Sequence, residues 1–170
     1  MQLVKFYNPR QTTNYQIFDN FSLIKGIIWV HLVHDKLVGL FGLGSKDPVK
    51  KSISKKKKEL RKLVKAKKYD SALRIGSEIL KKNPDENDVL FIIGGIYYMK
   101  TKYRTAISYF EKSLEIATHD VEVLILNANS YFRLGNFKQA ISCCDTIKEI
   151  DPKNKAVIDL LEKIESAKSN

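Results

Sequence analysis

The sequence predicts an all-α helical solenoid of three helix-turn-helix repeats plus a C-terminal capping helix, preceded by an N-terminal segment without repeats. An aromatic residue recurs every 34 residues, and an alanine follows three residues after each: Tyr69, Tyr103, Phe137 and Ala72, Ala106, Ala140. Between these markers the apolar residues follow helical spacing. A period of this length is typical of stacked two-helix units, since a single unit cannot bury its own apolar face.

The apolar spacing places the elements in order along a repeat domain at residues 46–168. The repeats are expected at about 53–84, 87–118 and 121–152, and the cap at 155–168. We expect helix pairs at 53–66 with 69–82, 87–100 with 103–117, and 120–134 with 137–150. Pro84 and Pro152 end the second helices of their repeats because proline disfavours helical geometry in the preceding residue. Gly135 separates the last pair, and Asp120 is an expected N-cap.

Residues 1–45 lack the period, and three interpretations stay open for them. The run from Ile27 to Val33 reads as a short β-segment, which could form a hairpin with residues 37–43. An isolated hairpin is marginal in water, so the segment could instead dock on the first repeat. The third interpretation is that the native chain starts near Val38 and that the upstream part is an over-extended reading frame.

The positive charge is concentrated in one stretch. The net charge is +11, and residues 46–68 carry twelve Lys or Arg against two acidic residues, whereas residues 69–170 carry fourteen basic and fifteen acidic residues. The longest apolar window, residues 27–33, is far shorter than the about twenty residues that span a membrane. With no recognisable signal peptide and only two cysteines, we expect a cytoplasmic protein.

No constellation of residues indicates catalysis, a metal or a cofactor. His31 and His34 could share a helix face, but they lack a complete ligand set. Cys143 and Cys144 have no evident base to activate them. The glycine-rich residues 39–44 lack the context of a phosphate loop. The sequence therefore predicts a protein that is not an enzyme and needs no cofactor.

The second repeat resembles the tetratricopeptide repeat. Its matching residues are Ile93, Gly94, Tyr97, Tyr103, Ala106, Phe110 and Ser113. The third repeat is similar, whereas the first has Lys56 and Leu60 where the family prefers an aromatic and a small residue. The resemblance implies a right-handed solenoid that serves as a scaffold or adaptor for another protein.

In this family the first helices of the repeats line a concave groove for a peptide or partner helix. Carried over by position, the groove residues are Lys57, Arg61, Phe91, Tyr98, Ile125, Asn129, Phe132 and Arg133. Such a groove suits a partner with an acidic portion and apolar anchors. Alternatively, Phe91, Ile125 and Phe132 belong to the core, and the lysines are a solvated face.

One subfamily holds a C-terminal carboxylate with two lysines, two asparagines and an arginine. The corresponding positions here are Lys57, Arg61, Ile92, Glu122 and Leu126. Only Lys57 agrees, and Glu122 would repel a carboxylate. The sequence therefore argues against this carboxylate clamp.

A second possible function is association with nucleic acid or an anionic membrane. It would use a basic patch of Lys55, Lys56, Lys58, Lys62 and Lys65 within the stretch 50–68. No aromatic residue lies between Lys46 and Lys68, so a platform for base stacking is not indicated. The alternative is a lysine-rich, solvated end of the solenoid.

Overall fold

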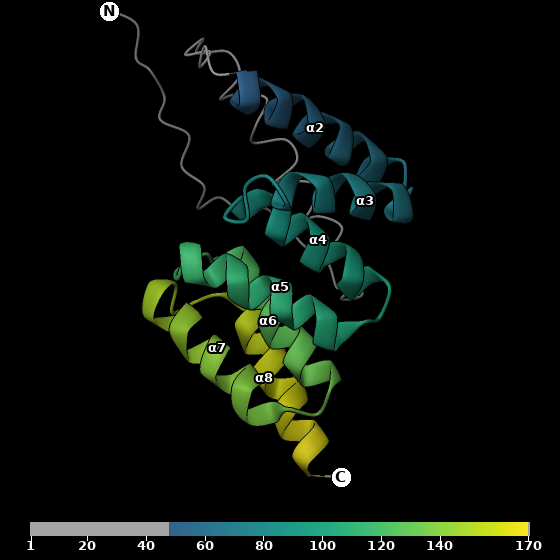
Figure 1. The fold of residues 1–170 in the computed structure, drawn as a ribbon. Coiled ribbons are helices and arrows are strands. Elements are labelled where there is room, and N and C mark those ends of the chain that lie inside the picture. Colours follow the sequence, from purple (N-terminus) through teal and green to yellow (C-terminus); the bar gives the residue numbers. More distant parts are fainter. Residues whose placement is uncertain (1–47, 170) are drawn as a thin grey trace, which may run out of the picture.

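The computed structural model describes residues 48–169, and over this range the chain forms seven helices and no strand. The helices are α2 (Pro48–Lys65), α3 (Tyr69–Leu80), α4 (Asn87–Met99), α5 (Tyr103–Ile116), α6 (Val121–Arg133), α7 (Phe137–Ile150) and α8 (Lys155–Lys168). They stack in chain order, with α2 at one end and α6, α7 and α8 at the other (Figure 1). The predicted all-α repeat solenoid is confirmed. The three interpretations of residues 1–45 concern a segment outside the described residues.

The first helix starts earlier than its sequence pattern indicates. Helix α2 begins at Pro48, although the apolar period pointed to about residue 53. Proline suits the first turn of a helix because the amide hydrogen that it lacks would have no partner there. Val49 in its first turn is 53% exposed, so periodicity could not reveal this turn.

The predicted N-cap of α6 is confirmed. The Asp120 carboxylate accepts hydrogen bonds from the backbone N–H groups of Glu122, at 3.1 Å, and Val123, at 3.2 Å. Asn154 caps α8 in the same way through the N–H of Val157, at 3.3 Å. These bonds satisfy donors that the first turn of a helix leaves free.

One turn geometry recurs between the two helices of every repeat. Lys67, Thr101 and Gly135, which are 34 residues apart, all have positive φ, at 57°, 57° and 76°. In each turn the next N–H donates to a carbonyl five residues earlier, as from Lys68 to Leu63. This is a Schellman ending, in which glycine is usual and a threonine costs about 1–2 kcal/mol. The sequence revealed only the Gly135 copy.

The core divides into two clusters that meet at α6. The first cluster contains residues of α2, α3, α4 and α5, together with Val123 and Leu126 of α6. The second contains α7 and α8 and takes Leu124, Ile125 and Ala128 from α6. The three periodic alanines are fully buried, which leaves room for close approach of the paired helices. The two clusters thus use different faces of α6.

Candidate functional site

The first helices α2, α4 and α6 present residues at equivalent positions along one face of each helix. We call this set the inner face. Its columns, each spaced by 34 residues, are Lys57, Phe91 and Ile125; Arg61, Gly95 and Asn129; Val64, Tyr98 and Phe132; and Lys65, Met99 and Arg133. All eight residues expected in the groove belong to these columns.

Two residues expected in the groove lie in the core instead. Phe91 is only 1% exposed, and its ring centroid lies 6.3 Å from that of Phe110 on α5. Ile125 is buried in the second core cluster. Both side chains are used to pack helices, so neither offers appreciable surface to a ligand in this structure.

The column of Val64, Tyr98 and Phe132 makes a similar aromatic contact in the second and third repeats. Tyr98 meets Tyr103 edge to face with ring centroids 5.2 Å apart, and Phe132 meets Phe137 at 6.0 Å. Such pairs stabilise beyond the area that they bury. The rings of Tyr98 and Phe132 therefore fix the end of one helix against the start of the next, and Phe132 stays half-buried.

Three polar side chains of the inner face have hydrogen-bonding capacity that the fold does not use. The Tyr98 hydroxyl is buried and makes no well-aligned hydrogen bond. Burial raises the pKa of Tyr98, and the nearby Arg133 guanidinium only partly offsets this, so the hydroxyl keeps its proton. Arg133 is exposed, and no ion pair involves it within residues 48–169. Asn129 donates from Nδ2 to the Ile125 carbonyl at 2.8 Å, which leaves its side-chain oxygen as an acceptor.

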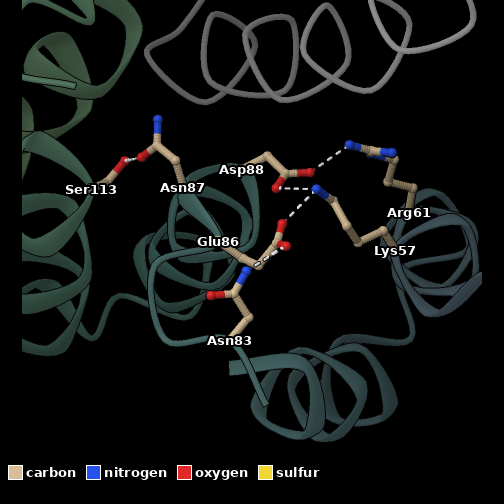
Figure 2. A network of polar contacts seen from close by, with 7 residues as sticks. All are labelled: Lys57, Arg61, Asn83, Glu86, Asn87, Asp88 and Ser113. Carbon is tan, nitrogen blue, oxygen red and sulfur yellow. Dashed lines mark hydrogen bonds and ion pairs between the residues drawn. The ribbon is translucent and has the colours of Figure 1, made fainter. Parts of the chain in front are cut away.

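The basic end of the expected groove is neutralised within the fold (Figure 2). Lys57 Nζ lies 2.7 Å from Glu86 Oε2 and 2.7 Å from Asp88 Oδ1, and Arg61 Nη2 lies 2.6 Å from Asp88 Oδ2. Asn83 Nδ2 donates to Glu86 Oε1 at 2.8 Å. Two cations thus face two carboxylates. The acidic partner expected here would have to compete with Glu86 and Asp88.

Polar contacts around this network fasten the start of α4 to α2 and to α5. Glu86 and Asp88 point toward α2, whereas Asn87 points the other way and accepts a hydrogen bond from the Ser113 hydroxyl of α5 (Figure 2). Ser113 is fully buried. The start of α4 is therefore fixed from two sides by three consecutive residues.

The network makes stability depend on pH through Glu86. Burial alone would raise the pKa of Glu86, but hydrogen bonds from Lys57 and Asn83 and the Lys57 charge outweigh it, so the pKa is lowered. A lowered pKa adds stability that is present above the unfolded value of about 4.3 and is lost as pH falls through the folded value.

Replacing Glu86 with glutamine is expected to cost about 1 kcal/mol near pH 7 and less at a pH below the lowered pKa of Glu86, where its carboxylate is protonated and uncharged. Urea unfolding at both pH values measures the difference. Glu115→Gln, on exposed α5 surface, is the control. A cost for Glu86→Gln that is equal at both pH values would contradict the role of the ionised carboxylate.

The predicted basic patch divides between two sides of α2. Lys55, Lys58, Lys62 and Lys65 are exposed. Lys56 is half-buried and pairs with Glu78 of α3, with Nζ 2.6 Å from Oε2. Lys56 thus holds α2 against α3 and does not share the surface of the other four.

The remaining candidate chemistry is weak. Burial raises the pKa of both Cys143 and Cys144 to about 11, so both thiols stay protonated at neutral pH. Among residues 48–169 no group of three or more His, Cys, Asp or Glu side chains could hold a metal ion. His31 and His34 lie outside this range. None of the helices described is both long and apolar enough to cross a bilayer.

A hollow of about 500 Å³ lies away from the inner face, between α3, α4 and α5. Leu80, Leu90, Tyr109 and Ile116 line it together with charged residues of both signs. This mixed lining defines no ligand, so the inner face is the candidate site.

Comparisons with known proteins agree on the fold. Residues 97–164 match the tetratricopeptide repeat family, and no curated protein matches the chain. The first such domain of Spaghetti (RPAP3), solved with an HSP90 peptide, is 19% identical with a TM-score of 0.65 over 69% of this chain and 94% of that one. The Hsp90 co-chaperone Cns1 from Saccharomyces cerevisiae is 21% identical with a TM-score of 0.66, over 73% and 41%.

Stacked two-helix units with a 34-residue period define a helical repeat protein. Residues 97–164 match the tetratricopeptide repeat family, and the described helices have the fold of tetratricopeptide-repeat domains.

Proposed function

We propose that the protein is a non-catalytic scaffold or adaptor that binds an extended segment of another protein on its inner face, through Tyr98, Asn129 and Arg133. The observation that carries this proposal is a buried tyrosine hydroxyl without a well-aligned hydrogen bond beside an exposed guanidinium. Buried polar groups nearly always have partners, and a ligand carbonyl or carboxylate would supply one here. The proposal keeps the cytoplasmic location expected from the sequence.

Structural neighbours support binding of a peptide. The Spaghetti domain is bound to the HSP90 peptide SRMEEVD, and the second such domain of human RPAP3, 17% identical with a TM-score of 0.60 over 65% of this chain and 92% of that one, is in complex with the HSP70 peptide SGPTIEEVD. In this chain Ile92 and Leu126 are core residues and Lys57 is paired internally. The proposed ligand is therefore not a carboxylate held in the clamp arrangement.

The chemistry of the inner face describes the partner. Tyr98 requires an acceptor, Arg133 favours a carboxylate or carbonyl, and Asn129 offers an acceptor to a peptide N–H. Since Lys57 and Arg61 are engaged, an acidic group of the partner belongs near Arg133. The half-buried Phe132 provides an apolar contact next to it.

The test begins with affinity purification of the tagged full chain and mass spectrometry of what it retains. Titration of the purified partner should then show about tenfold weaker binding for Tyr98→Phe and for Arg133→Gln, because each loses one hydrogen-bonding group. Tyr109→Phe and Arg104→Gln, both on α5, are matched controls.

Circular dichroism should show the same helix content for all four variants. Full affinity in both inner-face variants, or an equal loss in the α5 controls, would remove the inner face as the binding site.

A further inference from the structure

Five lysines form a continuous stripe along α2. Lys51, Lys55, Lys58, Lys62 and Lys65 follow one another at steps of four, three, four and three residues, and all five are exposed. These steps keep the side chains on one helix face over about 20 Å. The buried residues Ile53, Leu60 and Val64 occupy the opposite face. The stripe therefore points directly away from the core.

The stripe keeps its charge. Within residues 48–169 none of its five lysines takes part in an ion pair, whereas Lys56 and Lys57, on the other side of α2, are both paired. Glu59 is the only acidic residue of α2, and it forms no ion pair with the stripe. The nearby acidic residues of α3 are engaged too, since Asp70 pairs with Lys100 and Glu78 with Lys56.

Helix α2 lies at one end of the stack (Figure 1), and the stripe is on the side of α2 opposite the core residues Ile53, Leu60 and Val64. A flat surface can meet the whole length of such a face at once. No other helix of the described chain shields it, because the contacts of α2 with α3 run along its core face.

We propose that this lysine stripe adsorbs the protein to an anionic lipid membrane. Lysines near an anionic bilayer add affinity of about fivefold each without requiring insertion of apolar groups. The stripe contains no aromatic or large apolar side chain, so its attraction is electrostatic and reversible. Adsorption through this face leaves Lys57, Arg61 and Val64 of the inner face on a different side of α2, and only Lys65 belongs to both sets.

The composition of the stripe favours lipid over other polyanions. Arginine, which reads guanine edges, and aromatic rings, which stack on bases, are both absent from it. Protein interfaces are depleted in lysine and rely on aromatic and arginine anchors. Lipid headgroups diffuse laterally and can match any arrangement of five ammonium groups, whereas the phosphates of a duplex are fixed in position.

The experiment measures sedimentation of the full chain with vesicles of phosphatidylcholine, with and without phosphatidylserine. The natural sequence should bind at least about tenfold more tightly to the anionic vesicles, and salt of about 0.5 M should release it. Changing all five stripe lysines to glutamine should remove this preference. Lys55→Gln alone should weaken binding by about fivefold, whereas Lys56→Gln should leave it unchanged.

A charge-matched control separates the stripe from net charge. It changes five exposed lysines elsewhere to glutamine: Lys138, Lys148, Lys153, Lys155 and Lys163. This variant should bind anionic vesicles within about twofold of the natural sequence. The proposal is overturned by an equal loss in this control, by lack of vesicle binding, or by a duplex oligonucleotide binding more tightly than the vesicles through the same five lysines.

Discussion

Replacing Phe110 with alanine is expected to lower the free energy of unfolding by about 3–5 kcal/mol. Phe110 is fully buried, and its ring lies between α4 and α5, close to Phe91 and directly over Gly94. Its removal leaves a cavity at the contact that holds the second repeat together. Urea unfolding followed by circular dichroism measures the loss. Ile116→Ala, at a 46% exposed position on the same helix, should change stability by less than about 0.5 kcal/mol.

Gly94 provides an internal check on this contact. A Cβ at Gly94 would lie 2.6 Å from Cε1 and 2.7 Å from Cδ1 of Phe110, so Gly94→Ala should destabilise the natural protein by about 1–3 kcal/mol. In the Phe110→Ala background the same change has room and should stabilise by about 1 kcal/mol, since alanine favours helix. Strictly additive effects in this double-mutant cycle would show that the two residues do not meet.

Replacing Ile164 with alanine is expected to cost about 2–5 kcal/mol. Ile164 is fully buried on the face of α8 that covers Ala140, Cys144 and Ile147 of α7. Helix α8 is the last helix described, and its apolar face closes the second core cluster. Thermal melting of the two proteins provides the comparison.

The same helix offers a matched control in Ile158, which is 45% exposed. Ile158→Ala removes the same atoms and should cost less than about 0.5 kcal/mol. Equal melting temperatures for the two variants would mean that α8 does not seal the end of the stack.

Periodicity predicted the stacking of the helices but not all of their turns. The aromatic and alanine columns identified two helices per repeat because each column has a packing reason. Lys67 and Thr101 have a positive φ as Gly135 does, yet neither residue type indicates it. The start of α2 could not be predicted for a similar reason, since Val49 in its first turn is 53% exposed.

The candidate site shows a different limit of sequence reasoning. Side chains at equivalent positions of the repeats point the same way but are buried to different extents. Phe91 and Ile125 therefore belong to the predicted columns and still lie in the core. The pairing of Lys57 with Asp88 joins residues 31 apart, three short of the repeat. A search for opposite charges at nearly one period would have found it, because long charged side chains of neighbouring first helices can reach one another.

The division of the core at α6 determines how a bound partner would change amide hydrogen exchange in the protein. Tyr98 packs in the first cluster, whereas Phe132 packs in the second. Each cluster can open as its own cooperative unit in amide hydrogen exchange, since solenoids are held by nearest-neighbour contacts. A ligand that spans Tyr98 and Arg133 would couple the two units, so the slowest-exchanging amides of both should slow together when it binds.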